Sequence, residues 1–252
     1  MTSRTGARTP DFWLRLAAAL FGLTQIQAAC SYTPPPLPSS GQGADTLGEG
    51  RIAAGVEAGL GTSASWWKAS NMTDVDVNSK WVGGLRVRRG MGADVDLGLV
   101  GGIGPQHSFV VGPEFKWRFA HVAAPEADGP AFHAAWVTGL GVGAADDYTA
   151  NGANARRDIF LAPYTGVLGS GGVQAAQMYV GFRLAASDNF FNGRDDLTLY
   201  PVLQFGFLAK PDKDWSLFLE TDLAGGLTTQ DFGDSALIFY PTAGLSYSFA
   251  GP

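Results

Sequence analysis

Charge is scarce in this sequence. Only 16% of its 252 residues are Asp, Glu, Lys or Arg, whereas ordinary soluble domains carry about 25%. The folded chain must therefore present an unusually apolar surface for a protein that faces water. A basic excess is missing as well, because the formal net charge is -6, so nucleic acid is not expected as a partner.

Long apolar runs are also nearly absent. The run 16–26 is too short for a membrane-spanning helix, which takes about 20 residues, and no later stretch supplies one. This run follows an arginine-containing region and precedes the small residues of "QAAC" (27–30), which is the order found in secretory signals. Residues 1–30 are therefore predicted to be a signal peptide.

Cys30 is the single cysteine, so the chain cannot form an internal disulfide. Its place directly after two alanines resembles the lipid-attachment cysteine of bacterial lipoproteins, although Gln27 stands where that family prefers Leu. The resemblance implies a lipidated Cys30; the alternative is that an ordinary signal peptidase cuts nearby and Cys30 has no role. The segment 31–50 is rich in Pro, Ser and Gly and lacks periodicity, which predicts an extended linker before a folded part, residues 51–252.

A helical period is missing from residue 51 onward. Apolar side chains instead occupy every second position, which is the pattern of β-strands with one apolar face. Such strands, about ten residues long, exceed what is usual in globular proteins but suit a tilted crossing of a hydrocarbon layer. Ten alternating runs are predicted as strands: 52–60, 81–87, 95–99, 109–119, 132–142, 161–167, 178–184, 197–207, 215–223 and 237–249.

The connections between these runs alternate in length. Such alternation is typical of transmembrane barrels, which have short periplasmic turns and longer outer loops. The sequence therefore predicts an all-β fold: an antiparallel transmembrane β-barrel of about ten strands with up-and-down topology. Short connections lie at 89–92, 169–172 and 209–214, longer polar ones at 63–80, 144–158, 186–196 and 226–236, and two depart from the rule, 102–107 and 120–130.

Proline recurs at one height of the predicted barrel. Pro113, Pro163, Pro201 and Pro241 each lie in an even-numbered predicted strand, on the apolar parity. Proline cannot donate a ladder hydrogen bond. Its recurrence predicts either a shared bulge or ladder end near the outer rim, or the positions at which regular pairing begins.

The content of the two parities predicts which face meets lipid. The polar parity carries glycine and most of the charge, so it is predicted to face the lumen. If the turn at "GMG" holds three residues, Arg88 faces Asp94 and Arg86 faces Asp96, which gives each buried charge a partner. The apolar parity carries aromatic girdles of the kind found at membrane interfaces. Their members are Trp117, Phe119, Phe132, Phe207, Trp215, Tyr247 and Phe249 on the turn side and Trp81, Phe109 and Phe239 on the loop side.

The last strand carries the sharpest motif. Thr242, Gly244, Tyr247 and Phe249 fill a polar-x-Gly-x-x-hydrophobic-x-aromatic pattern. In this motif and in its alternation, the chain from residue 51 onward resembles the outer-membrane β-barrel superfamily, in particular its small eight- to ten-stranded members. The resemblance implies that the four residues form an insertion signal read by the barrel-assembly machinery. It also implies the outer membrane of a Gram-negative-type bacterium, with membrane lipid and lipopolysaccharide as partners.

A small cup is predicted in the loop-side half of the lumen. Glycines on several strands leave space there, and Tyr200, Tyr240, Arg183 and Asp222 project from the other side. We hypothesise that these four residues hold a sugar or another small polar ligand. The alternative is that the glycines only admit bulky rings, which fill the space.

Catalytic and metal chemistry find little support. The three histidines are scattered along the chain, and His107 and Ser108 point to opposite faces if the strand has begun, which makes a poor catalytic pair. No enzyme activity, metal or cofactor is therefore expected. The sequence favours a non-enzymatic barrel with a largely plugged lumen, acting through its outer loops and rim in surface binding, adhesion or envelope integrity. The alternatives are a narrow channel for small solutes and, less favoured, an outer-membrane hydrolase.

Overall fold

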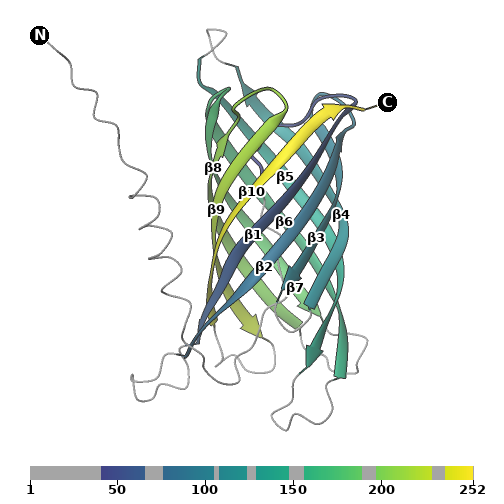
Figure 1. The fold of residues 1–252 in the computed structure, drawn as a ribbon, viewed down its shortest axis with the longest axis vertical. Helices are drawn as coiled ribbons and strands as arrows, with labels where there is room; N and C mark the ends of the chain where they lie inside the picture. The colour runs from purple at the N-terminus through teal and green to yellow at the C-terminus, as the bar shows by residue number, and fades with distance from the viewer. Residues whose placement is uncertain are drawn as a thin grey trace, which may run out of the picture.

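The chain forms a closed barrel in which neighbouring strands pair in sequence order and β1 pairs with β10 (Figure 1). The computed structural model describes residues 41–65, 76–104, 108–123, 129–147, 156–188, 197–228 and 236–251. All ten ladders are antiparallel, which confirms the predicted fold class and topology. The strands are β1 (Arg51–Ser65), β2 (Asp76–Gly90), β3 (Val95–Gly104), β4 (Ser108–Val122), β5 (Ala131–Asp147), β6 (Arg156–Val173), β7 (Ala176–Asp188), β8 (Leu197–Ala209), β9 (Trp215–Thr228) and β10 (Ala236–Ala250).

The two rims of the barrel differ in their connections. An even number of strands brings the start of β1 and the end of β10 to one rim, where Arg51 lies opposite Ala250. We call this rim, uppermost in Figure 1, the turn side, and the opposite rim the loop side.

The short turn predicted at 169–172 is displaced, because the glycines there pair with β7 and the turn falls at Gln174 and Ala175. Glycine marks turns only statistically, and here Gly172 lies opposite Gln177 within the ladder.

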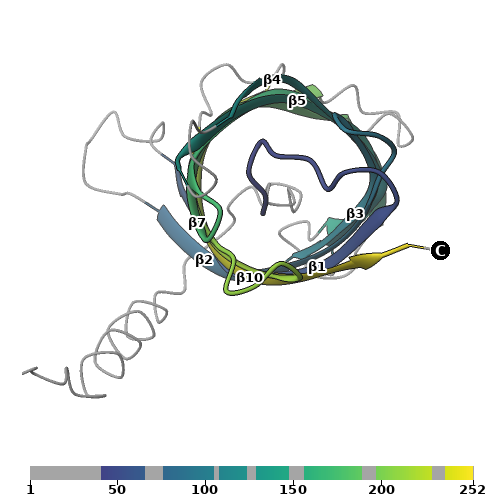
Figure 2. The same ribbon diagram turned by 90° about the horizontal axis from the view of Figure 1, so that it is seen from above.

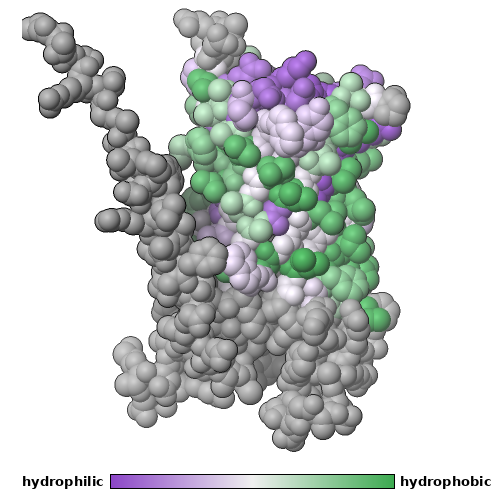
Figure 3. Space-filling model, viewed as in Figure 1, coloured by the Kyte–Doolittle hydropathy of each residue, from purple (hydrophilic) through white to green (hydrophobic). Residues whose placement is uncertain are grey.

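The outer face of the barrel is a membrane surface. Figure 3 shows hydrophobic residues over the barrel wall and hydrophilic residues gathered at the turn-side rim. The aromatic residues of both predicted girdles are exposed on this face, and the rings of Trp215 and Tyr247 lie 4.9 Å apart. The exposed Trp136 donates its indole N–H to Thr165 over 2.7 Å, which satisfies a polar group that lipid could not. A closed barrel with this exterior is an outer-membrane barrel. Among the described residues, no helix is long and apolar enough to cross a membrane.

The four prolines interrupt four ladders at one height. Between β4 and β5 the pairing stops after Val111 and resumes at Glu114, so that Pro113 and the residue before it are skipped. The other three prolines show the same gap towards the next strand of the barrel. The missing proline N–H explains each gap. Every strand continues on both sides of its gap, so the prolines mark neither ladder ends nor the start of pairing. Two residues are skipped on each strand at every gap, so the gaps are not bulges either, and both sequence interpretations are corrected.

The loop-side half of the lumen is filled by rings and aliphatic side chains. Tyr200 has no exposed surface and packs in one buried cluster with Tyr164, Tyr240, Val202 and Ile238. Glycines make room for these rings. A Cβ atom at Gly139 would lie 2.4 Å from the Tyr164 ring, and one at Gly61 would lie 2.6 Å from the Tyr240 ring. The glycines thus admit bulky rings, as the second interpretation of the cup proposed.

Candidate functional site

The turn-side half of the lumen contains a short segment of the chain itself, residues 41–47, which we call the strap. Figure 2 shows it inside the ring of strands. It enters beside Gly90, where an added Cβ would lie 1.8 Å from the carbonyl oxygen of Gly48. Ala44 has no exposed surface, and Gln42 is 3% exposed.

The strap lies within the predicted linker 31–50. Small and polar residues without periodicity are typical of linkers, yet the same small side chains let a chain enter a narrow lumen. Residues 1–40 lie outside the described residues, so the signal peptide, the remainder of the linker and the lipidation of Cys30 stay predictions.

Backbone N–H groups tie the strap to three parts of the barrel wall. Gly41 donates to Glu220 Oε2 on β9 over 2.9 Å, and Ala44 donates to Ser170 Oγ on β6 over 3.0 Å. Leu47 donates to Asp96 Oδ1 on β3 over 3.1 Å. Because hydrogen bonds from three sides of the closed wall hold the strap in place, it is an ordered part of the lumen.

The ammonium of Lys116 is solvated by the strap. Its Nζ donates to Gln42 Oε1 and to the carbonyl oxygen of Gly43, each over 3.1 Å, and also to the carbonyl oxygen of Asp45. The Lys116 side chain is 1% exposed, and Nζ lies 3.7 Å from Asp96 Oδ2. Strap oxygens therefore replace the water that a buried ammonium loses.

Gln42 is bonded to two further wall residues. It accepts a hydrogen bond from Arg88 Nη1, and its own Nε2 donates to Glu114 Oε1 over 3.1 Å. One strap side chain therefore links a guanidinium from β2 with an ammonium and a carboxylate from β4. At the rim, Lys210 pairs with the Asp45 carboxylate.

The predicted ion pairs of the β2–β3 hairpin are wrong in their partners. The turn holds residues 91–94, so Arg88 lies opposite Gly98. Arg88 pairs with Asp96 over 3.3 Å, Arg86 with Glu114 over 3.3 Å, and the exposed Asp94 with Arg118 over 2.7 Å. The turn is centred two residues further along the chain than expected, so every facing partner is displaced by four positions.

The predicted ligand residues are brought together but covered. Arg183 and Asp222 pair over 3.5 Å, and the Arg183 guanidinium carbon lies 5.4 Å from the centre of the Tyr164 ring. Asp222 lies opposite Tyr240, and both tyrosines, Tyr200 and Tyr240, are buried. In this conformation Tyr200 offers no surface to a ligand, so a ligand role for these four residues stays a prediction.

Two histidines that the sequence left scattered meet at the turn side. A β-bulge between Arg118 and Ala120 sets His121 opposite His133, with their Nδ1 atoms 3.0 Å apart. The sequence contained a signal for this contact, because both histidines lie near the facing ends of consecutive predicted strands. Within the part of the chain that the structure describes, no group of three or more metal-ligating side chains forms. His107 lies outside that part.

The insertion motif occupies β10 next to the barrel closure. Tyr247 and Phe249 are exposed on the lipid-facing side, whereas Thr242 is buried. Its recognition by the assembly machinery stays a prediction.

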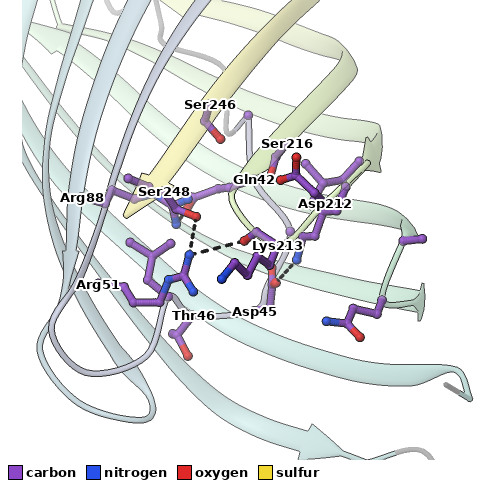
Figure 4. Close-up of a pocket in the computed structure, with 18 of the residues that line it drawn as sticks. Gln42, Asp45, Thr46, Arg51, Arg88, Asp212, Lys213, Ser216, Ser246 and Ser248 are labelled. Atoms are coloured by element: carbon purple, nitrogen blue, oxygen red, sulfur yellow. Dashed lines mark hydrogen bonds and ion pairs between the residues drawn. The ribbon is translucent and has the colours of Figure 1, made fainter. Parts of the chain in front are cut away.

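A cavity distinct from the cup predicted around Tyr200 opens beside the strap at the turn side (Figure 4). We call this turn-side cavity the cup. Its volume is about 700 Å³, within the usual range of roughly 300–1,000 Å³ for small-molecule sites. The strap forms one wall. The opposite wall comes from β1, from the turn between β8 and β9, and from the turn-side ends of β9 and β10. Side chains that line it include Arg51, Arg88, Lys210, Lys213, Ser216 and Ser246.

Acid is expected to loosen the strap through Asp45. Burial alone raises the pKa of this carboxyl, but attraction to Lys210, Lys116 and Arg88 outweighs burial and holds the pKa well below its usual range. A depressed folded-state pKa stabilises the fold above the unfolded pKa of about 4, and this stabilisation is lost as the pH falls through the folded value. Asp45→Asn should therefore destabilise the barrel at pH 7 and less so at pH 2.5, where part of this stabilisation is already lost.

Urea unfolding in detergent micelles, followed by tryptophan fluorescence, measures this difference. Glu49→Gln, which removes an exposed carboxylate next to the strap, serves as the matched control. An Asp45→Asn penalty of equal size at both pH values would contradict the assignment.

Comparisons with known proteins bear on the fold. No protein-family model matches the chain, and no curated protein matches it in sequence. It is similar to the N-terminal β-barrel domain of OprF from Pseudomonas aeruginosa, at 10% identity, with 81% of this chain and 100% of that chain covered and a TM-score of 0.40. It is also similar to an outer membrane channel from Pseudomonas putida F1, at 11% identity, 82% and 98% coverage and a TM-score of 0.47.

A third similar structure is the outer membrane protease OmpT from Escherichia coli, at 11% identity, 82% and 100% coverage and a TM-score of 0.40. These likenesses are weak and concern barrel architecture alone. The outer-membrane character of this chain follows from the exterior of its own barrel.

Proposed function

We propose that this protein is a non-enzymatic outer-membrane barrel with a closed lumen, which acts through its outer loops and rim in surface binding, adhesion or envelope integrity. The strap carries the proposal, because it occupies the turn-side lumen and is bonded to buried wall charges. Membrane lipid and lipopolysaccharide are the partners that such a barrel would meet, and the barrel-assembly machinery would insert it.

The filled lumen favours this proposal over a narrow channel. Barrels of eight strands have interiors that side chains just fill, and the barrel diameter grows roughly in proportion to strand number. Here the loop-side half contains the Tyr200 cluster and the turn-side half contains the strap. A hydrolase is less favoured, because His121 and His133 use their Nδ1 atoms on each other rather than on a nucleophile.

Planar-bilayer recording tests the closed lumen. The protein is expected to insert without unitary conductance steps, because the strap and the Tyr200 cluster occupy the lumen. Gly90→Ala should displace the strap where it enters, whereas Gly92→Ala, at a turn position with open space around it, is the matched control. Stable unitary steps from the unaltered protein would overturn the proposal in favour of a channel.

A further inference from the structure

The cup beside the strap has more hydrogen-bond donors than its own residues use. Within the described residues, the Arg51 side chain bonds only through Nη2, which reaches Asp214 Oδ1, Ser248 Oγ and the carbonyl oxygen of Lys213. Its Nε and Nη1 atoms have no protein partner there. The ammonium of Lys213 likewise has no hydrogen-bond or ion-pair partner in the described part of the chain. Arginine and lysine donors are therefore free to meet a molecule in the cup.

The carboxylates of the cup are already engaged. Asp212 Oδ1 accepts the backbone N–H groups of Asp214 over 2.8 Å and Trp215 over 2.7 Å, which shapes the turn before β9. The Asp45 carboxylate is held by Lys210. The acidic residues thus hold the turn and the strap in place. The hydrogen-bonding groups of the cup that have no protein partner are mainly donors.

Hydroxyl groups line the wall between the cationic residues. Ser216 on β9 lies opposite Ser246 on β10, and both line the cup. Neither hydroxyl has a hydrogen-bond partner within the described ranges. Ser248 lies one inward-facing position further towards the rim and is already bonded to Arg51. Serine hydroxyls both donate and accept, so this wall suits a ligand that itself carries hydroxyl groups.

We propose that the cup is a binding site for a small hydroxylated anion, of the class of carboxylated or phosphorylated sugars, which reaches it from the periplasm. Guanidinium and ammonium donors suit carboxylate and phosphate oxygens, and charge-assisted hydrogen bonds of this kind are the strong ones. The site opens at the turn side, which is the periplasmic side of an outer-membrane barrel. It makes no use of the outer loops and is independent of whether the lumen conducts.

Calorimetric titration of the full chain in detergent micelles tests this site with three sugars that share one ring. Glucuronate carries a carboxylate, glucose 6-phosphate carries a phosphate, and glucose carries neither charge. At 150 mM salt, which screens non-specific attraction, at least one of the two anions should bind saturably with one site per chain, at least about tenfold more tightly than glucose. Whichever anion binds more tightly identifies the acceptor group.

Two cup variants and one matched control make the test specific. Lys213→Ala and Arg51→Gln should each weaken binding of the anion by about three- to tenfold, because each removes charge-assisted donors. Arg89→Ala removes a cation near the same rim whose side chain is exposed on the outer face of β2, and it should leave the affinity unchanged. Absence of saturable anion binding, equal affinity for glucose, or an equal loss in Arg89→Ala would overturn the proposal. So would unchanged affinity in both cup variants.

Discussion

Lys116→Met is expected to release the strap from the lumen. Methionine keeps much of the apolar stem but removes the ammonium that binds Gln42, Gly43 and Asp45. Two carbonyl oxygens of the strap, one buried and one partly buried, then lose a charged donor, at a cost of roughly 1–3 kcal/mol for each unsatisfied group. The wall carboxylates keep other partners, since Arg88 still pairs with Asp96. The strap can recover its hydration only by leaving the wall, so the penalty of about 2–6 kcal/mol should appear as undocking.

Thiol labelling measures this undocking directly. Ala44→Cys, in a chain whose only native cysteine is replaced by Cys30→Ser, places a thiol where the side chain has no exposed surface. A maleimide reagent should label it slowly in the parent barrel and at least about tenfold faster with Lys116→Met, since each 1.4 kcal/mol is a factor of ten.

Arg118→Met is the matched control for the strap. Arg118 lies on the same strand and pairs with the exposed Asp94 rather than with strap atoms. It should leave the labelling rate unchanged. Equal labelling rates in the parent barrel and in Lys116→Met would show that the strap is held by something other than the ammonium.

Gly112→Ala is expected to give the largest loss of barrel stability. A Cβ at this position would lie 1.9 Å from the carbonyl oxygen of Leu140 and 2.8 Å from the Cα of Gly141. These atoms are backbone atoms of β5, so no side-chain rotation can relieve the contact. Gly112 also lies in the ladder gap at Pro113, where β4 can approach β5 closely only without a side chain.

Overpacking usually costs about 1–3 kcal/mol, and a clash with backbone should exceed this range. The gel mobility shift between the heated and unheated barrel, together with urea unfolding in micelles, measures the loss. Gly101→Ala is the control, because its Cβ would meet its nearest neighbour at 3.5 Å, an ordinary contact. A Gly112→Ala barrel as stable as the Gly101→Ala barrel would contradict this account of the close approach.

Much of the barrel could be predicted because strand alternation is a local property. A side chain faces lipid or lumen according to the parity of its position, and exposed Trp117 and buried Lys116 show both outcomes on one strand. The even strand number places the start of β1 and the end of β10 at the same rim. This prediction again needs no knowledge of distant contacts. The exception is His121, whose face depends on the bulge after Arg118, a feature that parity does not reveal.

Contacts between strands could not be predicted with the same certainty. Facing pairs depend on where the turn lies. The turn after Gly90 is centred two residues later than predicted, so Arg88 faces Gly98 instead of Asp94 and forms its ion pair with Asp96. The cup predicted around Tyr200 depended on whether rings or solvent fill the loop-side lumen. That is a matter of packing among side chains from several strands.

The sequence by itself determined the strand number, the lipid-facing surface and the charged lumen, because each follows from alternation along the chain. Only the tertiary structure decided that residues 41–47 enter that lumen. Their composition is that of a linker, and nothing in their own pattern favours a bound position. The position is set by Glu220, Ser170 and Asp96, from three strands far apart in sequence. These groups converge only when the barrel closes, and buried donors and acceptors must then be satisfied.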